Sequence, residues 1–512
     1  LSAAQTDILG PAGSVAFGTA VYVLPNGNLV VTDPAAPAAS QGAVYLFSPA
    51  GTLLSTLTGG HPNDALGSGG VTVLTNGNYV INSPSWNGGA GAVTWGDADA
   101  GVSGVVSSVN SLLGAGPGDE VGAGGVTALS NGNYVVSSPF WNGDGGATSK
   151  VGAVTWGDGS SGTVGAVSAA NSLLGTSDDD QLGIGGTVPL ANGYYLIISY
   201  AWDNGGTTDV GAVTRADGAG ALTGAVSAAN SLVGTNVDDQ VGLGGVTVLS
   251  NGNYLVVSYA WDGPGGGTPI TDVGAVTWVD GGSGLAGVVS VANSLVGSSN
   301  DDRVGISGVT ALANGHYVVL SERWNNGLAE SAGAATWGNG ATGATGVVSP
   351  ANSLTGSAIN DLVGAGGAVA LANGNYVVLS PSWFNPSTAA ATAGAVTWGN
   401  GSAGIAAAVS AGNSLVGLAT DDRVGYGGVA ALADGNYVVV SPFWDNGIIA
   451  DAGAVTRGDG AGGSVGAVSV ANSLIGTTTA DQVGGGGVTA LTNGHYVACS
   501  PLWDNGATAN AG

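Results

Sequence analysis

The sequence predicts an all-β fold built from tandem repeats of about 60 residues, each with four short strands. Three observations support this prediction. A hairpin motif recurs along the chain; Val, Thr, Tyr and Trp fill the segments between clusters of Gly, Ser, Asp and Asn; and no window of roughly 11 to 18 residues sustains the periodicity of a helix.

The first and second strands of each repeat flank a turn in the motif Leu-x-Asn-Gly-Asn-Tyr-Val-Val. Because an Asn-Gly pair accepts positive φ angles, we expect a tight hairpin with a type I′ turn. The first two copies are shorter. After them, successive turns lie about 60 residues apart. The nine turns begin at Asn26, Asn76, Asn131, Asn192, Asn251, Asn314, Asn373, Asp434 and Asn493.

The other two strands follow in a fixed order, as the copy around Asn131 illustrates. The second strand ends in Ser-Pro-Phe-Trp, and a glycine-rich loop leads to the third strand, Gly-Ala-Val-Thr-Trp-Gly. The fourth strand is expected in Gly-Ala-Val-Ser-Ala-Ala-Asn-Ser-Leu-Leu-Gly. β-Branched and aromatic residues at these positions favour strands, and the glycines between them favour turns.

Four-stranded units of this length, repeated without linkers, are typical of β-propeller blades. We therefore predict a β-propeller of eight or nine blades or an open propeller-like superhelix, with a β-solenoid as the alternative. The expected domain organisation is one repeat array over residues 1–512 with about nine units. Residues 1–10 resemble a fourth strand, and the last unit ends before its third strand, so we expect it to be incomplete.

Composition restricts the function classes. The formal charge of −27, from 33 acidic and six basic residues, opposes binding to nucleic acid or to anionic membranes. We expect no membrane insertion, because no run of about 18 apolar residues is present. The single cysteine allows no intrachain disulfide. An acidic, repetitive chain of this kind suits a secreted or cell-surface location.

Several short motifs resemble FG-GAP repeats, the blades of integrin-α-type propellers. Residues 302–305 and 422–425 resemble the Phe-Gly step with Val in place of Phe, residues 138–139 resemble the later Gly-Ala-Pro element, and residues 42–47 resemble the Gly-x-Val-Tyr-Val-Phe strand. The repeats are also similar to those of long bacterial filamentous-haemagglutinin-like surface proteins. These resemblances imply a propeller fold, secretion, and adhesion or a fibre role. The family's calcium loop between the first two strands is reduced here to Asn-Gly, so its calcium site does not carry over.

An aspartate recurs three residues before a Val-Gly or Leu-Gly step. Equivalent carboxylates on equivalent turns lack the contrasting environments that acid–base catalysis needs. We expect them to cap turns through backbone N–H groups, with weak calcium coordination as the alternative, and we predict no cofactor and no dedicated metal site. These candidate turn-capping residues are Asp64, Asp119, Asp180, Asp239, Asp302, Asp361, Asp422 and Asp481.

Tryptophans occupy two recurrent positions, one after the second strand and one in the third strand. A large aromatic side chain at a fixed repeat position either packs between neighbouring units or stacks on sugar rings at the surface. The candidates for contact with a glycan or another partner follow the second strand: Trp86, Trp141, Trp202, Trp261, Trp324, Trp383, Trp444 and Trp503. Arg215 and Arg457 replace the third-strand tryptophan in two units, which predicts partial exposure of that position.

These observations favour an extracellular structural or adhesive protein of a bacterial surface or fibre that acts through multivalent contacts and not through catalysis. A lectin-like, glycan-binding propeller is the alternative function. The expected partners are further copies of the chain in a filament, or a glycan or host-cell surface.

Overall fold

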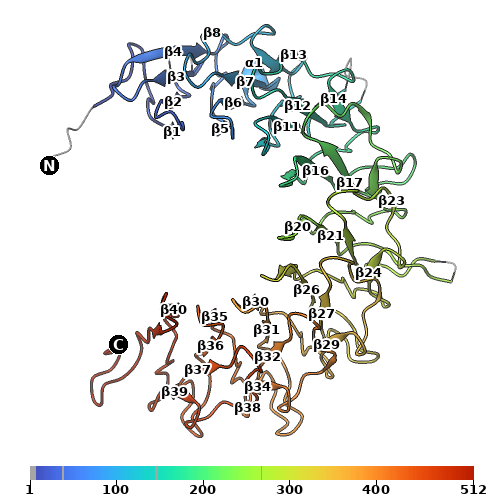
Figure 1. Cartoon of the computed structure of the whole chain (residues 1–512), viewed down its shortest axis with the longest axis vertical. Helices are drawn as coiled ribbons and strands as arrows, with labels where there is room; N and C mark the ends of the chain where they lie inside the picture. Colours follow the sequence, from blue (N-terminus) through green and yellow to red (C-terminus); the bar gives the residue numbers. More distant parts are fainter. Residues whose placement is uncertain (1–6, 37–39, 144–147, 267) are drawn as a thin grey trace. The chain divides into compact units, whose positions relative to one another are not determined.

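A computed structural model describes residues 7–36, 40–143, 148–266 and 268–512. The chain forms two compact units, residues 1–243 with 281–288 and residues 244–280 with 289–512. Both units are built in the same way. Among the described residues the structure is almost entirely β, and the four-residue α1 (Trp86–Gly89), which lies between β6 and β7, is an irregular turn in which Asn87 and Gly88 have positive φ (Figure 1).

Each repeat begins with a hairpin of two antiparallel strands. The first strands are β1(Ala20–Val23), β5(Val71–Val73), β10(Val126–Ala128), β15(Thr187–Pro189), β20(Val246–Val248), β25(Val309–Ala311), β30(Ala368–Ala370), β35(Val429–Ala431) and β40(Val488–Ala490). The second strands are β2(Leu29–Asp33), β6(Tyr79–Ser83), β11(Tyr134–Ser138), β16(Tyr194–Ser199), β21(Tyr254–Ser258), β26(Tyr317–Ser321), β31(Tyr376–Ser380), β36(Tyr437–Ser441) and β41(Tyr496–Ala498).

Two more antiparallel strands extend each hairpin into a sheet. The third strands are β3(Ala43–Phe47), β7(Ala92–Gly96), β12(Ala153–Gly157), β17(Ala212–Asp217), β22(Ala275–Val279), β27(Ala334–Gly338), β32(Ala395–Gly399) and β37(Ala454–Gly458). The fourth strands are β4(Leu53–Thr58), β9(Ser111–Leu113), β14(Ser172–Leu174), β19(Ser231–Val233), β24(Ser294–Val296), β29(Ser353–Thr355), β34(Ser414–Val416) and β39(Ser473–Ile475).

A two-residue strand from the following repeat pairs in parallel with the fourth strand and completes most sheets, as β18 does with β14. These linking strands are β8(Gly104–Val105), β13(Gly165–Ala166), β18(Gly224–Ala225), β23(Gly287–Val288), β28(Gly346–Val347), β33(Ala407–Ala408) and β38(Gly466–Ala467). The first unit contains four five-stranded sheets, and the second contains three five-stranded sheets, one four-stranded sheet and the β40–β41 hairpin. The predicted fold class, an all-β array of four-stranded repeats, is confirmed.

The hairpin turn differs from the type I′ turn that the sequence predicts. In the copy at Asn131, Leu129 and Asn133 are the closing pair, and the Gly132 N–H donates to the Leu129 carbonyl. Gly132 has a φ of 93°, whereas none of the described turn asparagines has a positive φ. The connection is therefore a three-residue loop, a type I turn followed by a left-handed glycine. The Asn side chain explains the preference, because its Oδ1 accepts the N–H of the residue two positions later.

The predicted fourth strand is also wrong in one respect, because it is split in two. Gly165–Ala166 pairs with the preceding repeat as β13, and only Ser172–Leu174 joins its own sheet as β14. A turn closed by Asn171 separates the two pieces, with the Ser168 N–H donating to Asn171 Oδ1. At the N-terminus, residues 1–6 of the strand expected over 1–10 lie outside the described residues, and residues 7–10 form no strand.

The core lies between successive sheets, so the second strands are buried on both faces. In the first unit, Val135, Val154 and Leu173 of one sheet share a hydrophobic cluster with Tyr195 and Ile197 of the next. Five-residue strands such as β11 are buried along their whole length. The near-continuous apolar runs of the second strands follow from this packing.

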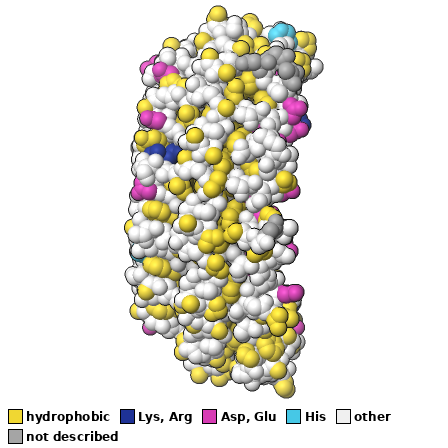
Figure 2. Space-filling model, turned by 90° about the vertical axis from the view of Figure 1, so that its right-hand side faces the viewer, with side chains coloured by type: hydrophobic (Ala, Val, Ile, Leu, Met, Phe, Trp, Pro, Cys, Tyr) yellow, Lys and Arg dark blue, Asp and Glu magenta, His cyan; other side chains and the backbone are white. Residues whose placement is uncertain are grey.

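The face drawn in Figure 2 is largely uncharged. Figure 2 shows acidic side chains standing singly or in small groups among uncharged atoms, with few Lys or Arg side chains. No helix in the described part of the chain is long and apolar enough to cross a membrane.

Candidate functional site

The recurrent aspartates lie in the connections between successive sheets. Asp302 Oδ2 accepts the backbone N–H groups of Ser298 and Ser299, at 2.7 and 2.9 Å, and Oδ1 accepts the N–H of Asn325 in the next sheet at 2.9 Å. Each carboxylate therefore closes its own turn and also holds the following repeat. The same three-bond arrangement occurs at Asp64, Asp119, Asp180, Asp361, Asp422 and Asp481. At Asp239 the two bonds within the turn are likewise present.

Burial decides the direction of the pKa shift at four of these carboxyl groups. All eight are at most 4% exposed. Desolvation raises the pKa of Asp180, Asp302, Asp361 and Asp422 above the usual range, although the backbone N–H bonds oppose it. In Asp481 desolvation is again the largest single influence, but the bonds from Thr478, Asp504 and Thr477 together outweigh it and lower the pKa.

The donor set around these aspartates suits turn capping better than metal binding. Both carboxylate oxygens face N–H groups, whose hydrogens would be directed at any cation. Within the described residues, no group of three or more His, Cys, Asp or Glu side chains is placed to hold a metal ion.

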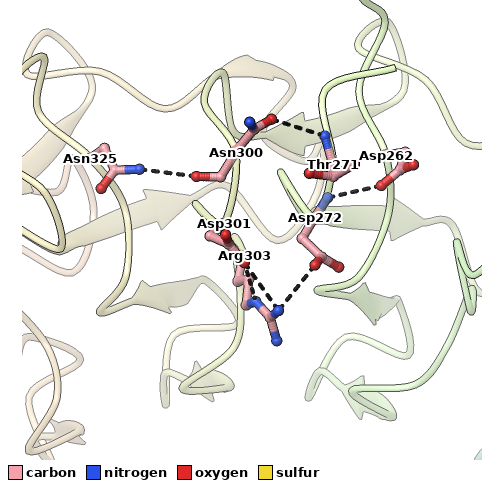
Figure 3. Close-up of polar contacts among 7 residues, drawn as sticks. All are labelled: Asp262, Thr271, Asp272, Asn300, Asp301, Arg303 and Asn325. Carbon is pink, nitrogen blue, oxygen red and sulfur yellow. Dashed lines mark hydrogen bonds and ion pairs between the residues drawn. The ribbon is translucent and has the colours of Figure 1, made fainter. Parts of the chain in front are cut away.

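Further polar contacts surround the aspartate at each junction, and Figure 3 shows those next to Asp302. Arg303 bridges Asp272 and Asp301, with N–O distances of 3.0 and 3.1 Å. On the opposite side, Asn300 accepts the Thr271 N–H through Oδ1 and accepts from Asn325 Nδ2 through its backbone carbonyl. The loop of one sheet, the connecting segment and the loop of the next sheet are thus tied together.

The tryptophans that follow the second strands lie in the interior. Trp86, Trp141, Trp202, Trp261, Trp324, Trp383 and Trp444 are 1–6% exposed. Apart from Trp261, these side chains belong to the hydrophobic clusters between sheets, and none of the seven is accessible to a sugar ring. Trp503 is half-buried. The structure therefore does not bring these eight side chains together on a surface.

The third-strand tryptophans make a contact between repeats that sequence reasoning missed. Trp156 Nε1 donates to the carbonyl of Gly218 in the following repeat at 2.8 Å. The same carbonyl accepts Asn131 Nδ2 at 2.8 Å and Asn133 Nδ2 at 2.9 Å. We call this convergence the glycine clasp. The other tryptophans at this position, Trp95, Trp278, Trp337 and Trp398, donate to Gly159, Gly340, Gly401 and Gly460.

Arg215 substitutes for the clasp tryptophan. Its guanidinium donates to the Gly281 carbonyl at 3.1 Å and lies 3.5 Å from the centre of the Tyr194 ring. Arg457 instead pairs with Asp434 of its own turn, at 2.7 Å. Arg215 is half-buried and Arg457 is exposed.

A second recurrent asparagine covers the linking-strand edge of six sheets. Asn171 Nδ2 donates to the carbonyl of Ala166 in the linking strand β13 at 2.9 Å. This bond occupies a carbonyl at the sheet edge that another strand could otherwise use. The signal was present in the sequence as the repeated Val-Ser-x-x-Asn-Ser-Leu. Equivalent bonds are made by Asn110, Asn230, Asn352, Asn413 and Asn472.

Comparison with known families identifies the repeat itself. The model of a repeat of unknown function, DUF5650, matches eight consecutive segments. Each full segment starts near the end of a first strand and ends just past the buried aspartate. The segments are residues 73–123, 128–184, 189–243, 248–306, 311–365, 370–426, 431–485 and 490–512. None of the curated proteins compared with the chain matches it.

Proposed function

We propose that this chain, which belongs to the family of DUF5650 repeats, is a structural and adhesive repeat protein of an extracellular surface or fibre, without catalytic activity. The observation that carries the proposal is the role of the recurrent polar residues. The aspartates, the clasp asparagines and the third-strand tryptophans all make contacts within the array, so the repeated signature builds an architecture and not a reaction site.

The finer proposal is that the array is FG-GAP-like and works at a bacterial surface. It is supported by the propeller-like antiparallel order within each sheet and by the resemblance of residues 42–47 to the family's aromatic strand. Charged residues are few, but nearly all are acidic. The resulting net charge of −27 favours solubility outside the cell and opposes contact with nucleic acid. Multivalent contacts then follow from presenting one equivalent surface per repeat. The glycan-binding alternative loses its main support, because seven of its eight candidate tryptophans are buried.

Electron microscopy of the purified chain at low and high concentration tests the structural part of this proposal. We expect rods or fibres to form as the concentration rises, because equivalent repeats can meet through contacts that do not close on themselves. Particles that stay discrete at every concentration would contradict assembly.

Protease treatment of intact producing cells tests the location. We expect loss of the chain from the cells together with a known surface protein, while a cytoplasmic marker is retained. A chain that survives until the cells are lysed would contradict an extracellular role.

A further inference from the structure

An open groove of about 540 Å³ lies in the first unit, where the connection between β6 and β7 meets the next repeat. Its lining includes Pro84, Gly88 and Gly89 from one side, and Glu120, Ala123 and Phe140 from the other. This volume falls within the usual range for ligand sites, roughly 300–1,000 Å³.

The connection that lines this groove is short. Only residues 84–91 join β6 to β7, whereas the longer segment 139–152 joins β11 to β12. The short connection also carries two glycines at the groove, and a Cβ added to Gly88 would meet nothing within 4 Å. The longer loops of later repeats have no counterpart here.

The equivalent junction in the second unit, around Arg423, contains an arginine and a tyrosine that the groove does not have. Arg423 follows the buried aspartate there, and its guanidinium lies 5.9 Å from the centres of the Tyr426 and Phe443 rings, which are 5.1 Å apart. By repeat position, Glu120 corresponds to Arg423, Ala123 to Tyr426 and Phe140 to Phe443. The groove in the first unit therefore has the same phenyl ring, Phe140. It has Ala123 where the later junction has a tyrosine, and the anionic Glu120 where the later junction has an arginine.

Glu120 gives the groove its charge. It is the charged residue of the lining, and its backbone, with φ of 43°, is held by an N–H bond to the Gly89 carbonyl at 3.0 Å. Within the described residues no ion pair joins Glu120 to a basic group, whereas Arg423 pairs with Asp421 at 3.2 Å in the later junction. A half-buried carboxylate beside an aromatic ring is a setting that favours a cation.

We propose that this groove binds the arginine side chain of a partner polypeptide. The guanidinium takes the place near Phe140 that Arg423 takes near Phe443, and it donates to the Glu120 carboxylate. The lining also holds the neutral polar residues Asn63 and Ser85, but arginine fits better than a neutral sugar because Glu120 is an anion beside an aromatic ring, and a protein of charge −27 attracts basic partners. This inference rests on the proposed adhesive role only in assuming that the ligand is a partner polypeptide.

Saturation-transfer NMR with a short Gly-Ser peptide that carries one arginine tests this site. The control is the same peptide with neutral citrulline in place of the arginine. We expect binding of the arginine peptide at low salt, at least about fivefold weaker binding of the citrulline peptide, and a similar loss in Glu120→Gln, as expected for one charge-assisted contact.

Glu322→Gln is the matched control, because it removes the same charge from the second unit. Equal binding of the two peptides, or equal losses in Glu120→Gln and Glu322→Gln, would overturn the site in favour of diffuse charge attraction. Far-ultraviolet circular dichroism confirms that each variant is folded. Assembly seen by electron microscopy does not depend on these results, so the groove and the proposed function fail separately.

Discussion

At the scale of single residues, each buried aspartate joins two repeats through three backbone N–H groups. Asp302→Ala leaves the N–H groups of Ser298, Ser299 and Asn325 without this acceptor. Since unsatisfied buried donors are costly, we expect a loss of roughly 2–4 kcal/mol in the free energy of unfolding, measured by urea denaturation. Asp301→Ala removes an exposed neighbour and should cost under about 1 kcal/mol. Equal effects in the two variants would refute the capping role.

The same carboxylates predict a pH dependence of stability. Burial raises the folded-state pKa of Asp180, Asp302, Asp361 and Asp422 above 3.8. At these four groups the folded chain therefore binds protons more tightly than the unfolded chain, and the groups lower stability as the pH rises through the interval between the two pKa values. Reducing the pH from 7 toward that interval should raise the urea midpoint. Asp302→Asn cannot titrate there, so its midpoint should rise less than that of the wild type.

At the scale of the strand, the asparagines over the linking strands protect the sheet edges. Asn352 Nδ2 donates to the Val347 carbonyl in β28 at 2.9 Å. Asn352→Ala should cost about 1 kcal/mol and expose an acceptor for strand addition. Light scattering during heating should show aggregation at a lower temperature than for the control Ala351→Ser in the same turn. Identical scattering curves would argue against edge protection.

The glycine clasp is a second device at this scale, and Arg215 provides its natural variant. Arg215→Trp restores the indole found in five other repeats, so we expect stability within about 1 kcal/mol of the wild type. Arg215→Ala loses the contact with Tyr194 and the guanidinium hydrogen bonds to the carbonyls of residues 281–283, and it should cost roughly 1–3 kcal/mol. Thermal unfolding distinguishes these outcomes. An alanine variant as stable as the wild type would mean that the clasp contributes little.

At the scale of the whole molecule, the sheets within each unit contact their neighbours in the array. Removing one complete period should therefore leave the remaining contacts intact. Deleting residues 315–373 joins Asn314 to Gly374, which then takes the place of the equivalent Gly315 in the hairpin turn. We expect a folded chain with an unchanged circular dichroism signal per residue. Deleting residues 315–344 removes β26 and β27 and should leave a protease-sensitive chain.

The sequence alone determined the repeat, its first three strands and the turn residues, because β-branched and aromatic runs and Asn-Gly pairs are local signals. It also indicated that the aspartates cap turns, since eight equivalent carboxylates have no catalytic asymmetry. The bonds between repeats were decided only by tertiary structure. Trp156 meets Gly218, and Gly165 leaves its own sheet to pair with Leu112, although each pair is widely separated in the sequence. No local pattern specifies such contacts, because they depend on how one sheet stacks on the next.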